Sequence, residues 1–342
     1  MRICQLLASN SSGGLAKHFI ELSNALSQIH DIVVICPAKF KTEFNSNIIH
    51  IEFEPRGSSN NPLNLYKFLQ AIKKAQPEII HAHGNSAVNF AAKAKLFSKI
   101  KTIGTIHWNL KRKKNRKGYE KLDSVIGISS GVLRDIKNPN QRIIHLGITP
   151  TGDPTDHRNQ LLSDYGLSRD KPICLAIGRL VKGKGFDLLI RAWQGVDANL
   201  LIVGDGPLRK DLDNLLKELN VTNTHLCGPI HNASRLIPSV DMVAISSHSE
   251  GFSYVLAEAL IDRKPVIATE VFGPLDVLPK FALVPIGNEK IMHEKLSQAT
   301  ANLEQWNQDF SDTYAWATKH LSMESMIRQT VEAYQDLLEP QP

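Results

Sequence analysis

The sequence has few cysteines and no long hydrophobic run. Its 342 residues contain four cysteines, scattered along the chain. No pair of them has the spacing of a disulfide scaffold or a metal site, which favours a reducing cytosol. No apolar run approaches the roughly 20 residues that a membrane-spanning helix needs. The short apolar stretch near the N-terminus is followed at once by Gly13 and Gly14, which is typical of a strand–loop–helix unit rather than a signal peptide.

Two further absences narrow the class of ligand. No G-x-G-x-x-G fingerprint follows the first predicted strand, so that loop is not a dinucleotide site. No motif of a known nucleic-acid reader is present, and we expect no nucleic-acid partner. The chain is therefore expected to be a cytoplasmic protein with another kind of ligand.

Positive charge is concentrated in one segment. The formal net charge is +6, and "KRKKNRKGYEK", Lys111 to Lys121, holds seven basic residues and one acidic residue. One interpretation is a solvated loop. The other is a patch that faces an anionic membrane surface or an anionic acceptor.

Short apolar strands alternate with helix-like stretches along most of the chain. "RICQLLA", "DIVVIC" and "EIIHAH" are examples in the first half, and the same order restarts with "PICLAIGRL" in the second. Continuous apolar strands separated by helices indicate parallel βαβ units with both sheet faces covered. A stretch rich in Pro, Gly, Asp and Thr begins at Thr149 and is interpreted as a linker. The sequence therefore predicts an α/β protein with two doubly wound domains, whose ligands bind at the carboxyl ends of the strands.

Several strand-to-helix loops carry groups suited to a phosphorylated ligand. Gly13 and Gly14 follow the first strand, and Gly204 lies in "VGDGP" after a later one. Glycines let the backbone approach a ligand closely, although a tight turn explains them equally well. Arg179 and Lys184 lie in "IGRLVKGKG" and can converge on a diphosphate. The planar guanidinium of Arg179 and the compact ammonium of Lys184 both suit this ligand. A solvated basic loop is the alternative.

Three histidines lie near predicted strand ends. "HAHG" contains His81 and His83, which we expect to point to opposite faces of their strand and so not to share a metal ion. His107, in "TIHW", is a better candidate for a polar contact with a substrate. A histidine satisfied inside the core is the alternative, and no metal site is predicted.

Two carboxylates flank an apolar turn in "SHSEGFSYVLAEALIDRKPVIATE". If a helix starts near Ser253, then Glu250 lies in the loop before it and Glu258 in its second turn. The free peptide N–H groups around Phe252 and Ser253 favour an anion at the helix start. Carboxylates accept hydrogen bonds from sugar hydroxyls. The segment therefore predicts a nucleotide-sugar site, with a glycosidase carboxylate pair as the rival interpretation.

These segments, in this order, resemble one family. "SEGFSYVLAEAL" with "KPVIATE" is similar to the E-x7-E segment of retaining glycosyltransferases of the GT-B fold, glycosyltransferase family 4. "GGLAKHFIELSNAL", "IIHAHG", "TIH", "AIGRLVKGKGFDLLIRAW" and "LLIVGDGP" match in order over nearly the whole chain. The chain departs from the family at Ile261-Asp262-Arg263, where the family has a small residue and glycine.

The resemblance implies a GT-B fold, in which two Rossmann-like domains face each other across a cleft. It implies an acceptor-binding domain at 1–150 and a nucleotide-sugar-binding domain at 151–324, with the last helix, 325–342, packing back on the first. The implied catalytic residues are Glu250, Arg179, Lys184 and His107. The implied donor-binding residues are Gly13, Gly14, Gly204, Ile230, Phe252, Ser253 and Glu258.

The expected activity is retaining transfer of a sugar from a UDP-, GDP- or ADP-sugar, without a metal or other cofactor. The expected acceptor is a glycan or lipid-linked molecule, such as a lipopolysaccharide core or a polyprenyl-linked glycan, at the inner face of the cytoplasmic membrane. Three alternatives stay open: a nucleotide-sugar epimerase of the same fold, a non-catalytic binding subunit, and a glycosidase.

Overall fold

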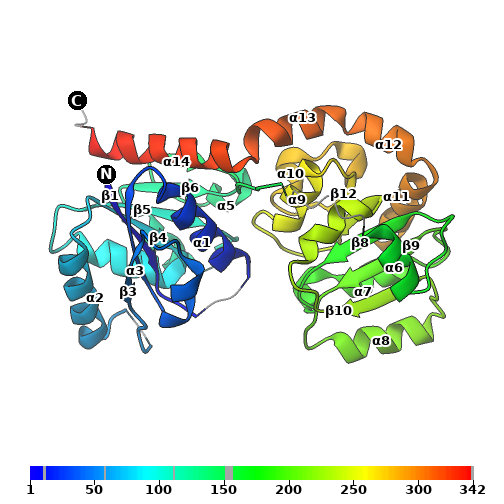
Figure 1. Ribbon diagram of the computed structural model, residues 1–342, viewed down its shortest axis with the longest axis horizontal. Helices are drawn as coiled ribbons and strands as arrows, with labels where there is room; N and C mark the ends of the chain where they lie inside the picture. Colours follow the sequence, from blue (N-terminus) through cyan, green and yellow to red (C-terminus); the bar gives the residue numbers. More distant parts are fainter. Residues whose placement is uncertain (11–12, 58, 111, 151–156, 340–342) are drawn as a thin grey trace. The chain divides into compact units, whose positions relative to one another are not determined.

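The chain divides into two compact units, each built on one parallel sheet (Figure 1). The computed structural model describes residues 1–10, 13–57, 59–110, 112–150 and 157–339. The first unit runs from Met1 to Gly147 and includes the C-terminal segment from Met323, whereas the second is Ile148–Ser322. The first unit is therefore assembled from both ends of the chain.

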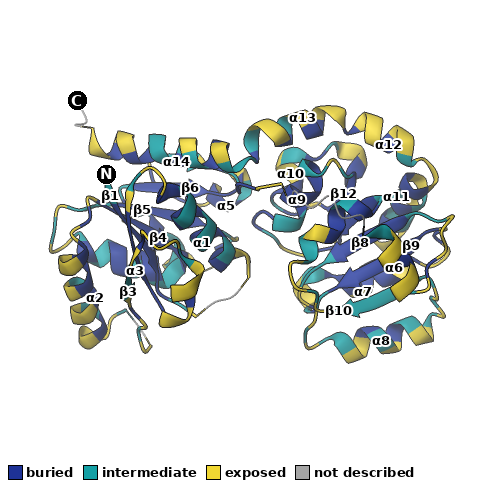
Figure 2. Cartoon of the chain, viewed as in Figure 1, coloured by how far each residue is buried: buried dark blue, intermediate teal, exposed yellow. Residues whose placement is uncertain are grey.

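The first unit has a seven-stranded parallel sheet in the order β3-β2-β1-β4-β5-β6-β7. The strands are β1 (Arg2–Leu7), β2 (Asp31–Cys36), β3 (Ile49–Glu52), β4 (Ile79–His83), β5 (Lys101–Ile106), β6 (Ser124–Gly127) and β7 (Gln141–Ile143). The central strands are buried along almost their whole length, as Figure 2 shows. The strand order reverses direction between β1 and β4, which makes the carboxyl ends of these two strands the expected ligand position in this unit.

Helices cover both faces of this sheet. They are α1 (Gly14–Leu26), the short helix η1 (Ala38–Glu43), α2 (Pro62–Ala75), α3 (Gly84–Ala94), α4 (Lys113–Tyr119), α5 (Ser130–Leu133) and α14 (Met323–Leu338). Phe19 of α1 and Met326 and Tyr334 of α14 share one core with Ile3 and Ile79 of the sheet. Helix α14 fits this position because its buried residues recur at helical spacing and form one apolar stripe.

The second unit repeats the arrangement with six parallel strands in the order β10-β9-β8-β11-β12-β13. The strands are β8 (Ile173–Ile177), β9 (Asn199–Val203), β10 (Thr224–Gly228), β11 (Met242–Ile245), β12 (Val266–Thr269) and β13 (Leu283–Val284). The helices are α6 (Arg158–Asp164), η2 (Lys182–Lys184), α7 (Phe186–Ala192), α8 (Arg209–Glu218), η3 (Ala233–Ser239), α9 (Tyr254–Ile261), α10 (Pro274–Val277), η4 (Lys280–Ala282), α11 (Glu289–Ala301), α12 (Leu303–Asp309) and α13 (Ser311–His320). Here the strand order reverses between β8 and β11.

The predicted α/β class with two doubly wound sheets is confirmed, and the differences are local. Lys111 of the predicted basic segment lies outside the described residues, and the rest is not simply a loop, because α4 occupies Lys113–Tyr119. The last strand of the first sheet, β7, is short and covers only Gln141–Ile143. The segment Ala233–Ser239 is a 3-10 helix, η3, that contains Pro238, which cannot donate a helical hydrogen bond.

None of the helices in the described part of the chain combines the length and the apolar character that a bilayer crossing requires.

Candidate donor-binding site and histidine cluster

Two loops of the second unit meet where its strand order reverses. Residues 178–185 follow β8, and residues 246–253 follow β11, which pairs directly with β8. The carboxyl ends of parallel strands lie at one edge of a sheet, so the two loops are neighbours there. The sequence-predicted residues Arg179, Lys184 and Glu250 all lie on them.

Lys184 and Glu250 contact each other directly. The Lys184 ammonium donates a hydrogen bond to a carboxylate oxygen of Glu250, and the two form an ion pair. The same Glu250 oxygen accepts a hydrogen bond of 2.8 Å from the Ser247 hydroxyl. Their side chains are only 28% and 15% exposed, so this pair is shielded more than a surface salt bridge. The structure therefore brings the predicted phosphate-binding cation and the predicted sugar-binding acid to one point.

Backbone contacts hold the two loops together. The Ser246 hydroxyl donates to the backbone oxygen of Lys184 at 2.9 Å, and the His248 N–H donates to that of Gly183 at 2.9 Å. Gly185 has a left-handed φ of 62°, and a Cβ there would lie 2.2 Å from the backbone oxygen of Ser246. Only glycine fits this approach. The position of Lys184 is thus fixed by its surroundings before any ligand arrives.

Gly204 follows β9 and packs against the loop after β8. Its φ is +146°, and a Cβ on it would lie 1.9 Å from the backbone oxygen of Gly178. The glycine is therefore required by the packing of two loops at the carboxyl edge. Its predicted contact with the donor remains a prediction.

We expect Gly204→Ala to lower the free energy of unfolding by about 2–6 kcal/mol, because backbone strain and overpacking each cost about 1–3 kcal/mol. Calorimetry or urea unfolding measures this. Gly183→Ala is the matched control, since a Cβ at Gly183 meets no atom within 4 Å. Equal stabilities of the two variants would contradict the steric argument.

Arg179 and Ile230 lie near the same edge without fixed side-chain partners. Arg179 is exposed directly after β8, and its guanidinium forms no ion pair or hydrogen bond with another described residue. Ile230 is half-buried just after β10. An exposed, unpaired guanidinium is available to an anionic ligand.

Helix α9 begins at Tyr254 with Ser253 as its N-cap residue, as the sequence predicted. Phe252 and Ser253 are buried, and Glu258, in the second turn, is only 6% exposed. A buried carboxylate is retained where it has polar partners. Glu250 lies in the loop before the helix, whereas Glu258 lies within it. The two carboxylates thus have different surroundings, so we do not expect them to play the same role.

Asp262 caps the C-terminus of α9 and gives this region a pH dependence. Burial, with a contribution from the Glu258 charge, raises the pKa of Asp262 from 3.8 to about 6. A raised carboxyl pKa means that the folded state holds the proton more tightly. The stability that this carboxyl group contributes is therefore fully present below pH 3.8 and is lost as the pH rises through about 6.

We expect Asp262→Asn to remove this loss. Its Tm relative to the parent should rise between pH 4 and pH 7, by roughly 2–4 °C for each kcal/mol of stability that the parent loses over that range. Thermal unfolding of both proteins across that range measures it. A Tm difference that does not change with pH would contradict the raised pKa.

In the first unit the predicted residues lie at the carboxyl edge of β1 and β5. Gly13 is the N-cap of α1 with a φ of 93°, and Gly14 is the first helical residue. A Cβ on Gly13 would meet no described atom within 4 Å, so its positive φ rather than crowding favours glycine. His107 is half-buried just after β5, and burial holds its pKa well below the usual 6.5.

A polar network that we did not predict runs through the buried face below His107. The Gln5 amide donates to the Tyr334 hydroxyl at 2.9 Å, and its oxygen lies 2.7 Å from Nε2 of His83. His81 contacts Tyr334 through Nδ1 at 2.6 Å and Thr105 through Nε2 at 2.7 Å. No local pattern reveals this network, because its members come from β1, β4, β5 and α14.

The expectation that His81 and His83 point to opposite faces is wrong. Their rings stack with centroids 4.3 Å apart. Residues two apart on a strand share a face, because side chains alternate with a period of two. Both therefore face α1 and α14, and His83 lies near His18 and His107.

Two family models match most of the chain. The model described as Glycosyltransferase Family 4 matches residues 12–151, and that of Glycosyl transferases group 1 matches residues 158–308. The two matches correspond to the two halves in which the parallel sheets were found.

Individual relatives agree with these matches. An uncharacterized glycosyltransferase of Methanocaldococcus jannaschii is 25% identical over 333 residues, covering 89% of this chain and 91% of the relative. The lipopolysaccharide core biosynthesis glycosyltransferase LpsD of Rhizobium meliloti is 27% identical over 276 residues, covering 77% of each. The crystal structure of Anabaena HepE in complex with UDP has a TM-score of 0.86 at 18% identity, covering 98% of this chain and all of that one. The chain therefore belongs to the glycosyltransferases of the GT-B fold, with a family 4 domain followed by a group 1 domain.

Proposed function

We propose that this protein transfers a sugar, with retention of configuration, from a nucleotide-sugar donor to a glycan or lipid-linked acceptor. The observation that carries the proposal is the grouping of Arg179, Lys184 and Glu250 beside the start of α9, at the reversal point of the second sheet. Cations and the positive end of a helix dipole suit a diphosphate, and carboxylates suit sugar hydroxyls. The similar HepE structure contains UDP, which supports a nucleotide donor.

The charged side chains and the histidine of the proposed site have separate tasks in the reaction. Arg179 and Lys184 offset the charge that develops on the diphosphate as the bond from sugar carbon to phosphate oxygen breaks. Glu250 and His107 contact the donor sugar, and Glu258 holds the ribose hydroxyls. The acceptor hydroxyl attacks from the leaving-group face, and its proton passes to the departing diphosphate. The two cations make a divalent metal unnecessary for this step.

The donor site is tested most directly by binding. We expect a UDP-, GDP- or ADP-sugar at a hundred times its Kd to stabilise the protein by about 2.7 kcal/mol, seen as a rise in Tm. No shift with any of the three would contradict a nucleotide-sugar site. Incubation with the stabilising donor alone, followed by NMR, should leave the sugar unchanged, and a newly formed isomer would indicate an epimerase instead.

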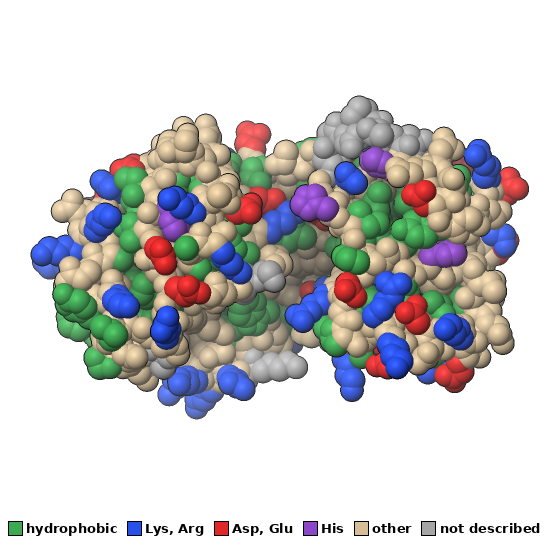
Figure 3. Space-filling model, turned by 60° about the horizontal axis from the view of Figure 1, so that its bottom comes forward, with side chains coloured by type: hydrophobic (Ala, Val, Ile, Leu, Met, Phe, Trp, Pro, Cys, Tyr) green, Lys and Arg blue, Asp and Glu red, His purple; other side chains and the backbone are tan. Residues whose placement is uncertain are grey.

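The acceptor proposal rests on a basic groove in the first unit. The groove measures about 1030 Å³ and is lined by residues in and just after α3 and α4, together with Gly57, Ser59 and Asn60. Its six lysines are Lys93, Lys95, Lys113, Lys114, Lys117 and Lys121. Figure 3 shows lysine and arginine side chains gathered at the edge of this unit. A concave surface with this charge favours an anionic ligand.

Not all of these charges are available to a ligand. Lys95 pairs with Asp123 at 2.6 Å, and Lys93 donates to Asn60 at 2.8 Å. Lys113, Lys114 and Lys117 are exposed on α4 and form no ion pair within the described part of the chain. We therefore assign acceptor or membrane contact to α4. An acceptor of the lipopolysaccharide-core class at the inner face of the cytoplasmic membrane fits this charge, and the name of the LpsD relative supports that class.

We expect the triple variant Lys113→Gln, Lys114→Gln, Lys117→Gln to bind anionic vesicles about a hundredfold more weakly at low salt, because each lysine near such a surface contributes about 1 kcal/mol. Sedimentation with phosphatidylglycerol vesicles measures this. The matched control changes Lys67, Lys73 and Lys74, which are exposed on α2 of the same unit. Equal loss in both variants would show a general charge effect and not a site on α4.

A further inference from the structure

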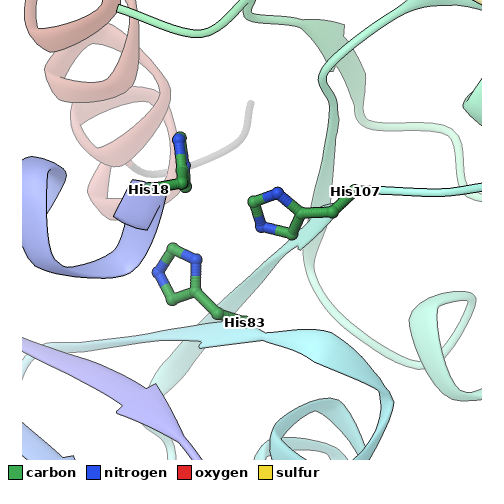
Figure 4. Close-up of side chains that lie close together, drawn as sticks. All are labelled: His18, His83 and His107. Carbon is green, nitrogen blue, oxygen red and sulfur yellow. The ribbon is translucent and has the colours of Figure 1, made fainter. Parts of the chain in front are cut away.

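Three imidazole rings in the first unit point toward one another (Figure 4). His18 comes from α1, His83 is the last residue of β4, and His107 follows β5. One nitrogen from each ring lies within 4.8 Å of the other two. These residues are far apart in the sequence, so the fold alone creates the cluster.

The nitrogens that meet are buried and unsatisfied. Nδ1 of His18, Nδ1 of His83 and Nε2 of His107 have no hydrogen-bond partner among the described residues. His18 and His83 are 3% and 1% exposed. A buried polar atom without a partner costs free energy, and such atoms are rare in folded proteins. Three of them in one place indicate a water or an ion that they hold in common.

The neighbouring network fixes which nitrogen of His83 is free. Gln5 donates through its amide nitrogen to Tyr334, so its oxygen must accept, and Nε2 of His83 must carry the proton. Nδ1 of His83 therefore presents a lone pair to the cluster. By contrast, both nitrogens of His81 are occupied by Tyr334 and Thr105.

The charge state of the rings also suits a cation. Burial lowers the pKa of His18 to about 4, and it holds the pKa of His83 and His107 well below 6.5. All three are therefore neutral at neutral pH. Only neutral imidazole binds a metal ion, so protons do not compete for this site under those conditions.

We infer that His18, His83 and His107 bind one divalent transition-metal ion of the Zn²⁺ class. Imidazole ligands suit Zn²⁺, Co²⁺, Ni²⁺ and Cu²⁺, whereas Mg²⁺ and Ca²⁺ prefer oxygen ligands. Three protein ligands leave a fourth tetrahedral position open to water or an anion. The Gln5 contact to His83 is the type of outer hydrogen bond that orients a metal-binding histidine.

The ion would act on transfer as an inhibitor. It occupies Nε2 of His107, the side chain that, in the proposed function, contacts the donor sugar. Sugar transfer should therefore persist in a chelator and fall when Zn²⁺ is added. This consequence rests on the proposed function, whereas the metal site itself does not.

Titration of the full-length protein with Co²⁺ tests the site without any assay of transfer. We expect one Co²⁺ per chain with the intense visible absorption of a tetrahedral ion, displaced by Zn²⁺ and not by Mg²⁺. His18→Gln should weaken Co²⁺ binding at least a hundredfold. Gln5→Met should weaken it about 10–100-fold, as loss of an outer-shell partner does.

His231→Ala is the matched control, because His231 is exposed and lies in the second unit. It should leave the titration unchanged. If His18→Gln does not fold, His107→Gln tests the same site at a less buried position. The inference is overturned if the parent shows no tetrahedral Co²⁺ spectrum, or if the folded histidine variants bind Co²⁺ as the parent does.

Discussion

Replacement of Lys184 by alanine is expected to lower kcat/KM for sugar transfer by about 10²–10³-fold, the usual cost of removing one group that stabilises transition-state charge. The ammonium is held in place by Glu250 and by the contacts between the loops after β8 and β11. Because it is positioned before the donor binds, no energy is spent on ordering it during the reaction. Steady-state kinetics with the donor found in the binding screen measure the effect.

The matched control for this experiment is Lys210→Ala, an exposed lysine on α8 of the same unit. It should change kcat/KM by no more than about twofold, since surface substitutions away from special features have small effects. Loss of activity in both variants would indicate unspecific charge attraction of the donor. Full activity of Lys184→Ala would remove this residue from the proposed site.

Replacement of Tyr334 by alanine is expected to destabilise the first unit by about 3–5 kcal/mol, the usual cost of emptying a buried aromatic position. Tyr334 is fully buried, and its hydroxyl contacts both Gln5 and His81. Tyr334→Phe keeps the ring and should cost about 1–3 kcal/mol, because two buried polar groups then lose their partner.

Hydrogen exchange followed by mass spectrometry can assign this loss to one unit, since peptides are read separately. Peptides from β1 and β4 should exchange faster in Tyr334→Ala, whereas those from β8 and β9 should not change. Tyr66→Ala, at a 60% exposed position on α2, is the control. Equal exchange rates in β1 of Tyr334→Ala and the parent would show that α14 does not stabilise the sheet.

The fold and the donor loops could be predicted because their signals are local. Apolar strands and helices alternate in the sequence, and parallel topology places every strand-to-helix loop at one edge. Lys184 and Glu250 could thus be assigned to one site from loop position alone. Their ion pair could not be predicted, since it depends on how Gly185 lets the two loops approach each other.

The histidine cluster and α4 could not be predicted, for a related reason. His18, His83 and His107 meet only after α1, β4 and β5 pack. Helix α4 has a largely charged sequence without an apolar stripe, so no helical period is visible in it. It is held by packing, because Gly118 approaches Val88 and Asn89 of α3 so closely that a Cβ would lie 3.1–3.3 Å from their side chains.

The position of α14 in the chain also reverses the usual order of folding during synthesis. The first sheet emerges early, but the helix that covers it follows the 175 residues from Ile148 to Ser322. At 5–20 residues per second, translation of that segment takes roughly 9–35 s. During this interval Gln5 and His81 have no tyrosine to contact, and the apolar face around them has no helix α14 to cover it. The unit that is translated first is thus completed last, and the newly made chain is most exposed to aggregation and to chaperone binding until Tyr334 has been added.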